Sequence, residues 1–388
     1  MKRPVLTLFL ALAVTALVGA QAATAGHGHG HHGNGHGHGN RGHRNHGVVF
    51  VQTNQPDGNA IAVYDRGRDG LLTRAGTYAT GGAGGTAAPG TESDRLASQD
   101  SLKLADRGRV LIAVNAGSDT VTSFRVRGDR LRRASVVDSG GAFPASVAVH
   151  GRLVYVLNAG GTGIVQGFWI GHHGQLTPIP GSARSLGLAN GDPPNFLMSP
   201  GDVAFTPGGA KLLVTTKAST SSIDVFQVHR NGRLSAAPVV NPSATPVPFA
   251  LLFRSPAQLI SVEAGMSSLT TYRIERSGTL TGPRSASDGQ TAACWIHRVG
   301  RYYYVTNTGS NNVSSFTIDA SGQPALLQAV AAATPPGPID MTSSGPFLYA
   351  ETGVQGTVEE FRVLGDGSLV PLGSVADLAP GIEGIAAT

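Results

Sequence analysis

The sequence predicts an all-β fold, a seven-bladed β-propeller made of four-stranded antiparallel blades. Three observations predict it: a repeat of about 45 residues, short apolar strands separated by tight turns, and two chain ends that each supply part of one blade. Repeats of roughly 40 to 50 residues with four short strands each are typical of propellers. A single repeating domain therefore accounts for most of the 388 residues, which could otherwise make two or three domains.

Each repeat contains an apolar strand, a polar turn rich in Asn, Gly, Ser or Thr, and a second strand that ends in an aromatic residue. Seven such aromatics occur along the chain: Tyr64, Phe124, Phe168, Phe226, Tyr272, Phe316 and Phe361. Their separations are 60, 44, 58, 46, 44 and 45 residues, so two repeats carry an insertion of about fifteen residues. The insertions fall near residues 81–98 and 181–200, between the outermost strand of one repeat and the innermost strand of the next.

Alternating apolar residues and turn residues place the strands within each repeat. Asp69-Gly70 and Asn231-Gly232 are typical of tight hairpins, because glycine accepts the positive φ that such turns require. Innermost strands are predicted at 144–149, 201–205, 249–253, 292–297 and 338–342, and second strands at 153–157, 212–216, 259–263, 302–306 and 347–351.

The two ends of the repeat region predict how the ring closes. The region opens at Val48 with a second strand that has no innermost strand before it, whereas residues 381–386 form an innermost strand with no second strand after it. Joined, the two complete one blade and leave no exposed sheet edge. An open β solenoid with frayed ends is the alternative.

The first 25 residues predict a secretory signal peptide. Lys2 and Arg3 precede an apolar stretch at 5–18, and Ala23-Thr24-Ala25 supplies small residues for cleavage near Ala25, with residues 20–22 as the rival site. The stretch is short for a membrane span, and no later apolar run approaches 18 residues. We therefore expect a secreted, extracellular protein without a membrane span.

Residues 26–47 carry eight of the thirteen histidines among glycine and asparagine. This composition predicts a disordered segment, because nothing in it offsets the loss of backbone entropy on folding. Neutral imidazoles can capture an adventitious divalent metal, and a solvated spacer is the alternative. No cofactor is expected to be required. The candidate metal ligands are His27, His29, His31, His32, His36 and His38.

Charge and cysteine content narrow the function further. The net charge is +5, but four basic residues and no acidic residue precede position 47, so 5 − 4 leaves about +1 for the remainder. Nucleic acid is therefore not expected as a partner, since its recognition needs a concentrated basic face. The only cysteine, Cys294, has no partner for an internal disulfide. We expect a monomer in which Cys294 is a buried thiol, with a reactive nucleophile as the alternative.

Candidate site residues come from the strand ends that converge on the channel at the face bearing the two insertions. Long loops on a rigid scaffold are common binding sites, although the glycine-rich first insertion is equally expected to be a loose lid. Converging carboxylates can provide a base with a raised pKa or bind a cation; alternatively they pin turns by bonding to backbone amides. The candidates are Asp100, Asp202, Cys294 and Glu383 from innermost strands, with Asn115, Asn158, Lys217, Glu263, Asn307 and Glu351 from second strands.

Residues 303–307, Tyr-Tyr-Val-Thr-Asn, followed by Gly309 and Phe316, resemble the signature of the lactonase family of seven-bladed propellers. This family includes 6-phosphogluconolactonase and the carboxymuconate cyclases, and residues 110–115 and 154–158 are weaker copies of the signature. The resemblance covers roughly residues 48–388 and implies hydrolysis of a small lactone or cyclic ester. The innermost strands lack a histidine at the channel mouth, since His297 lies at the far end of its strand.

Hydrolysis needs a base for water and a donor for the developing oxyanion. Glu263 and Glu383 are the candidate bases, and Lys217 or Arg184 would balance negative charge. The alternative function is a noncatalytic extracellular propeller that recognises a glycan, a peptide or an envelope component. A compact polar pocket with a carboxylate beside a cation would favour the enzyme, whereas a broad shallow face would favour binding.

Overall fold

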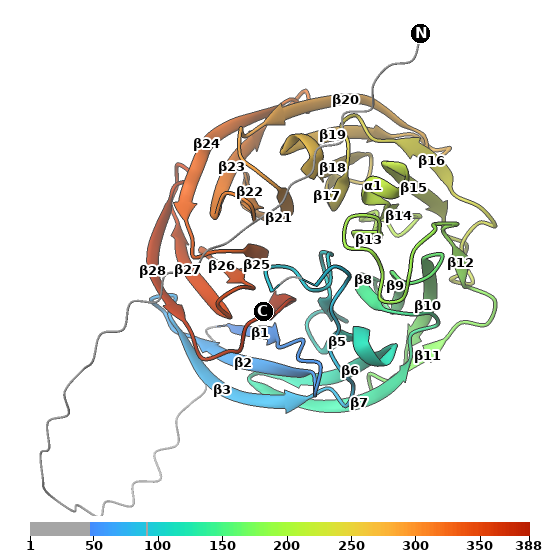
Figure 1. Ribbon diagram of the computed structural model, residues 1–388, viewed down its shortest axis with the longest axis horizontal. Helices are drawn as coiled ribbons and strands as arrows, with labels where there is room; N and C mark the ends of the chain where they lie inside the picture. The colour runs from blue at the N-terminus through green and yellow to red at the C-terminus, as the bar shows by residue number, and fades with distance from the viewer. Residues whose placement is uncertain (1–46, 91) are drawn as a thin grey trace, which may run out of the picture. The chain divides into compact units, whose positions relative to one another are not determined.

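The computed structural model describes residues 47–90 and 92–388. Within these residues the strands form seven antiparallel sheets, arranged around one axis as the blades of a β-propeller (Figure 1). The fold predicted from the repeat is therefore confirmed. The predicted signal peptide and the candidate metal ligands of the histidine-rich segment lie outside the described residues.

Blade 1 joins the two ends of the described chain, as the sequence predicted. From the axis outward it contains β29 (Ile385–Ala387), β1 (Val48–Gln52), β2 (Ala60–Arg66) and β3 (Leu72–Ala79). Strand β29 pairs antiparallel with β1, with Ala387 opposite Val49. The amide of Thr388 donates to the carbonyl of Val48 at 3.0 Å, which extends this pairing to the last residue. The C-terminal strand therefore closes the ring, although it begins at Ile385 and not at residue 381 as the sequence predicted.

The remaining blades follow in chain order. Blade 2 contains β4 (Leu102–Ala105), β5 (Val110–Asn115), β6 (Thr120–Arg127) and β7 (Arg130–Asp138). Blade 3 contains β8 (Pro144–His150), β9 (Leu153–Asn158), β10 (Ile164–Ile170), β11 (Leu176–Pro178) and β12 (Arg184–Ser185). Blade 4 contains β13 (Asp202–Phe205), β14 (Lys211–Thr215), β15 (Ser222–Gln227) and β16 (Val239–Pro242). Short helices α1 (Lys217–Thr220), η1 (Ala116–Ser118) and η2 (Ala264–Met266) lie between second and third strands.

Blades 5 to 7 are regular. Blade 5 contains β17 (Pro248–Ser255), β18 (Gln258–Glu263), β19 (Ser268–Ile274) and β20 (Leu280–Ser287). Blade 6 contains β21 (Ala293–Val299), β22 (Tyr302–Asn307), β23 (Asn312–Ile318) and β24 (Pro324–Ala333). Blade 7 contains β25 (Pro338–Ser344), β26 (Phe347–Thr352), β27 (Thr357–Val363) and β28 (Leu369–Val375). No helix among the described residues is long and apolar enough to cross a membrane.

Tyrosines of second strands join neighbouring blades at the predicted hairpin turns. The hydroxyl of Tyr349 in blade 7 donates to the carbonyl of Gly70 in blade 1 at 2.7 Å, and Tyr304 donates to Gly367 at 2.8 Å. Gly70 has a φ of +95°, and a Cβ there would lie 2.3 Å from the ring of Phe347. Glycine at this turn therefore serves both the hairpin and the packing between blades.

The two faces of the ring differ. The turn face carries the hairpins between innermost and second strands, and the insertion face carries residues 80–101 and 186–201, which enter β4 and β13. The second insertion starts later than the sequence suggested, because Arg184–Ser185 form β12 and pair with β10. The insertions contact each other: the amide of Phe196 donates to the carbonyl of Ala88 at 2.7 Å.

Candidate functional site

The first insertion fills the centre of the insertion face. Its residues 94–101 lie across the axis (Figure 1) and bond to inner strands of other blades. The indole nitrogen of Trp295 in blade 6 donates to the carbonyl of Ser98 at 2.9 Å, and the amide of Val147 in blade 3 donates to that of Asp100 at 2.9 Å. The shallow open mouth expected at this face is therefore occupied by the chain itself, and the insertion is held in place rather than loose.

Gln99 forms the innermost part of this closure. Its side-chain oxygen accepts a hydrogen bond from the amide of Ile296 at 3.0 Å, and its nitrogen donates to the carbonyl of Leu251 and to the Asp202 carboxylate, each at 3.4 Å. Asp202 also accepts from the amide of Leu251 at 2.9 Å. A single buried amide thus links blades 4, 5 and 6 and forms a floor across the axis.

Lys217 links the two insertions. Its ammonium donates to the carbonyls of Ala97 at 2.7 Å and Phe196 at 2.6 Å. Burial lowers the pKa of Lys217 to about 8, while the nearby Asp94 opposes this shift. The buried ammonium is therefore engaged in holding loops together, and it is not presented to an open cavity.

Glu383 and Asp94 anchor the same insertion from below. The Glu383 carboxylate accepts from the amide of Leu96 at 2.6 Å, and Asp94 accepts from the amide of Ala97 at 2.7 Å. Burial raises the pKa of Glu383 well above its ordinary value, with repulsion from Asp94 adding to the rise. Burial also raises the pKa of Asp94 to about 6. The raised pKa of Glu383 favours its protonated form, and protonation reduces the cost of placing it beside another carboxylate.

Glu263 lies in blade 5, away from the axial floor. Its carboxylate accepts hydrogen bonds from the amide of Thr245 at 3.0 Å, from the hydroxyls of Thr245 and Thr270, and from Tyr272. A base must direct a lone pair at substrate or water. All the recorded partners of Glu263 are structural groups, and the residue is fully buried.

The other second-strand candidates behave similarly. Asn115 donates to Thr120 and Thr122 at 3.0 and 2.9 Å. Asn158 donates to the carbonyls of Ser139 at 3.0 Å and Ile164 at 3.3 Å, and Asn307 donates to the side-chain oxygen of Asn312 at 2.8 Å. Glu351 accepts from the amide of Gly384 at 2.9 Å, and burial raises its pKa well above the ordinary value. Cys294 is buried, and burial raises the pKa of its thiol. The partners of these candidates are therefore groups of the protein itself.

A separate cavity lies on the axis beyond the Gln99 floor, toward the turn face. Its volume is about 220 Å³, and its lining extends from Gln99 to Phe205, Phe253 and His297 near the far ends of the innermost strands. The polar side chains that line it are Gln99, Asp100, Lys103, His297 and Asp340. Such a volume is large enough for a small ring compound.

Asp100 and Lys103 form an ion pair in this cavity. Burial alone would lower the pKa of Lys103, but attraction to Asp100, and more weakly to Asp202 and Asp340, outweighs burial and raises it. Lys103 is therefore a permanent cation at neutral pH. Its side chain is 38% exposed and that of Asp100 is 21% exposed, so both remain accessible from the cavity.

The same cavity raises the pKa of Asp340 and lowers the pKa of His297. Burial, reinforced by repulsion from Asp100, raises the pKa of Asp340 to about 8, so this carboxyl is largely protonated at pH 7. Burial and the positive charge of Lys103 lower the pKa of His297 to about 4, so its ring is neutral. The His297 Nε2 atom lies 2.9 Å from the Ser343 hydroxyl. The cavity thus combines a carboxylate, a cation and a protonated acid.

The sequence identified only part of this group. Asp100 and Asp202 are among the candidates predicted from the sequence, whereas Lys103 and Gln99 are not. The alternation of side chains along a strand could have identified Lys103. Every second residue of an innermost strand faces the axis, so polar residues within these strands are site candidates as much as those at the strand starts. No group of three or more potential metal ligands occurs among residues 47–90 and 92–388.

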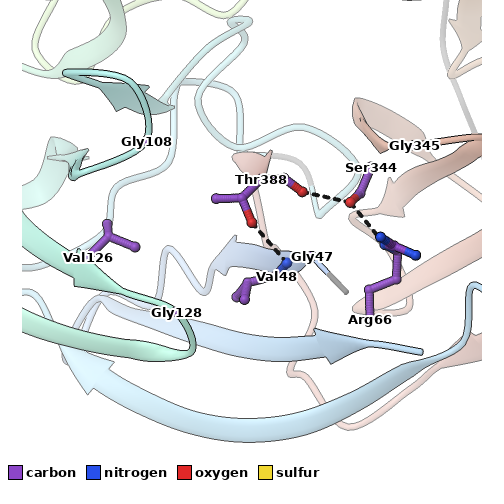
Figure 2. Close-up of a pocket in the computed structure, with 9 residues that line it drawn as sticks. All are labelled: Gly47, Val48, Arg66, Gly108, Val126, Gly128, Ser344, Gly345 and Thr388. Carbon is purple, nitrogen blue, oxygen red and sulfur yellow. Dashed lines mark hydrogen bonds between the residues drawn. The ribbon is translucent and has the colours of Figure 1, made fainter. Parts of the chain in front are cut away.

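A second hollow of about 430 Å³ lies at the turn face, where blades 1, 2 and 7 meet (Figure 2). Its one charged side chain is Arg66, which donates to the Ser344 hydroxyl at 2.9 Å and lies 5.4 Å from the ring of Phe347. Ser344 in turn donates to the carbonyl of Thr388 at 2.7 Å. These groups stabilise the closure of the ring, and no acidic side chain of the described residues lines the hollow.

Fold and cavity together define the chain as a seven-bladed propeller with a polar axial site. No protein-family model matches the sequence, and no curated protein matches it. Among solved structures, a periplasmic gluconolactonase from Pseudomonas aeruginosa has a TM-score of 0.68 at 20% identity, covering 88% of this chain and 98% of that one.

Two further structures are similar to the same extent. A Lactobacillus plantarum protein has a TM-score of 0.68 at 19% identity, covering 88% of this chain and 99% of that one. A Bacteroides fragilis protein, provisionally described as a 6-phosphogluconolactonase, has a TM-score of 0.66 at 18% identity with 88% and 98% coverage. The chain therefore has the propeller fold of lactonase-like proteins, as the resemblance implied.

Proposed function

We propose that the protein hydrolyses a small lactone or cyclic ester in the axial cavity. The observation that carries this proposal is the Asp100–Lys103 ion pair beside Asp340 in a cavity of about 220 Å³. A compact pocket with a carboxylate next to a cation supports an enzyme over a propeller that binds through a broad, shallow face. The lactonase-like fold adds support from the neighbouring structures.

In the proposed reaction, the Asp100 carboxylate takes a proton from water while the water oxygen adds to the lactone carbonyl carbon. The carbonyl electrons move to the oxygen, and the ammonium of Lys103 stabilises the resulting oxyanion. The electrons of the oxyanion then re-form the carbonyl as the ring C–O bond breaks. The departing ring oxygen receives a proton from the Asp340 carboxyl, whose pKa of about 8 keeps it protonated. The product is a hydroxy acid, and proton exchange with solvent restores both aspartates.

The charges of the cavity favour an uncharged substrate. Its one cation, Lys103, is already paired with Asp100, and Asp202 and Asp340 add further acidic groups around it. A phosphorylated lactone would bring two negative charges to a site without a free cation. We therefore propose a neutral sugar lactone or similar ring, met outside the cytoplasm after export directed by the predicted signal peptide.

Hydrolysis of a panel of five- and six-membered lactones, followed as acid release, tests the proposal. Lys103→Gln and Asp340→Asn are expected to lower kcat/KM by about 100-fold or more, because each removes a group that acts in the transition state. Wild-type activity should fall above about pH 8 as Asp340 ionises, and this decline should be absent from the residual activity of Asp340→Asn.

Arg230→Gln and Asp366→Asn remove charges of the same signs at exposed turns between third and fourth strands and serve as controls. No turnover of any lactone by the wild type would refute the proposal. Full activity in both cavity variants, with loss in Glu263→Gln or Glu383→Gln, would instead transfer the chemistry to the residues predicted from the sequence.

A further inference from the structure

A cluster of arginines occupies the hairpin between β6 and β7 in blade 2. Residues 125–133 contain five arginines and one aspartate, although residues 47–388 as a whole carry a net charge of only about +1. The overall charge therefore conceals a local basic surface. This surface lies on the outer two strands of its blade, away from the axial cavity.

Strand register brings four of these arginines together. Arg125 lies opposite Arg132, and Arg127 lies opposite Arg130, so alternation places all four on one face of the hairpin. With Leu131 they line a groove of about 320 Å³. We refer to these four arginines and Leu131 as the arginine groove.

Folding does not account for this arrangement. Like charges directly opposite each other in an antiparallel pair destabilise a sheet. None of the four guanidinium groups forms an ion pair with a carboxylate among the described residues, whereas Arg74 in blade 1 pairs with Asp377 at 2.7 Å. Arg127, Arg130 and Arg132 are exposed, and Arg125 is partly buried. The groove therefore presents unneutralised positive charge to solvent.

A turn of blade 3 lies against the same surface. A Cβ on Gly174 would lie 3.2 Å from the Cγ atom of Arg125, and the amide of Leu176 donates to the Ser135 hydroxyl of β7 at 3.0 Å. Glycine at position 174, with a φ of +83°, keeps this approach open. The hairpin that carries the arginines is thus supported by its neighbour, so the charges sit on a fixed scaffold.

We propose that the arginine groove binds a linear acidic polysaccharide through its carboxylate groups. Arginines two residues apart on a strand are separated by roughly 6.5 to 7 Å, so the groove offers two parallel rows of cations to a repeating anionic chain. Guanidinium groups bind carboxylates in a bidentate manner. The groove has no aromatic side chain, whereas proteins that bind single-stranded nucleic acid stack bases on aromatics. The site is separate from the proposed axial chemistry.

Binding of the full-length protein to polygalacturonate, measured by calorimetry at about 50 and 200 mM salt, tests this proposal. The wild type should bind, and binding should weaken as salt rises, because bound cations are released from the polyanion. Arg127→Gln/Arg130→Gln should lower the affinity at least about 10-fold and reduce the salt dependence. Arg230→Gln/Arg276→Gln removes two exposed arginines from turns of other blades and should bind like the wild type.

Dextran and a thymidine oligonucleotide complete the test. Dextran is uncharged and should not bind. Failure of the wild type to bind polygalacturonate, or equal losses in the groove and control variants, would overturn the proposal. Tighter binding of the oligonucleotide with the same dependence on Arg127 and Arg130 would overturn it in favour of nucleic acid. The groove variants should remain folded, with thermal unfolding at or above the wild-type temperature, since they relieve repulsion.

Discussion

The two ends of the propeller axis contain similar residue types in different surroundings. At the insertion face, Lys217, Asp94 and Glu383 are all buried and bond to backbone groups of the insertions. On the other side of Gln99, Lys103 and Asp340 line a cavity. The first group bonds to the loops of the insertions, whereas the second lines a cavity. Shifted pKa values occur at both ends, so the adjacent cavity, rather than the charge, identifies the candidate site.

The largest expected effect tests the closure on which both ends depend. Deletion of residues 381–388 removes Glu383 and strand β29, so β1 loses its inner partner and the first insertion loses an anchor. We expect no soluble folded protein, as judged by size-exclusion chromatography and circular dichroism. A truncated protein with unchanged thermal unfolding would show that the ring does not need its last strand.

The next largest effect is a difference in stability between a substitution in the floor, at Gln99, and one in the cavity, at Lys103. Gln99→Ala leaves the buried amide of Ile296 without a partner and opens a void, which should cost about 3 kcal/mol of unfolding free energy. Lys103→Gln should cost less than about 1 kcal/mol, because its ion pair is partly exposed. Urea unfolding of both variants measures the difference. Equal losses would show that Lys103 is as structural as Gln99.

The smallest effect is a pH dependence at the insertion face. The pKa of Lys217 is about 8 in the folded protein and 10.5 in the unfolded chain. Between these two pH values the unfolded chain therefore binds more protons than the folded protein. Stability from this group therefore rises with pH, by about 1 to 2 kcal/mol between pH 8 and about 9.5. Lys217→Met should lack this increment in urea unfolding at the two pH values. Parallel changes in wild type and variant would contradict the assignment.

The fold was predictable because its signals are local and repeated. The spacing of aromatics from Tyr64 to Phe361 gave the number of blades, and glycines such as Gly70 marked the hairpins at which blades contact each other. The closure by β29 followed from counting strands at the two ends. These features depend on residues close in sequence or on a fixed period, and neither requires knowledge of long loops.

The site was less predictable because a loop decides it. Residues 94–101 have no periodic pattern, and nothing in their composition indicates that Gln99 would cross the axis and bond to three blades. Because this segment occupies the insertion face, a carboxylate such as Glu383, which was expected at an open channel mouth, instead accepts a hydrogen bond from the backbone of the insertion. The arginine groove was hidden for a different reason, because a net charge averages over the surface and register alone brings Arg125 beside Arg132.

The pairing of β29 with β1 has a consequence for engineering. Val48 and Thr388 are hydrogen-bonded neighbours, so a short peptide could join them without disturbing the blade. New termini could then be opened at an exposed hairpin such as Gly300, where a φ of +60° and open space impose no packing. Such a circular permutant would retain every strand pairing, with blade 6 instead of blade 1 assembled from both ends of the chain. The starting point of the polypeptide could then be moved around the ring without a change of fold.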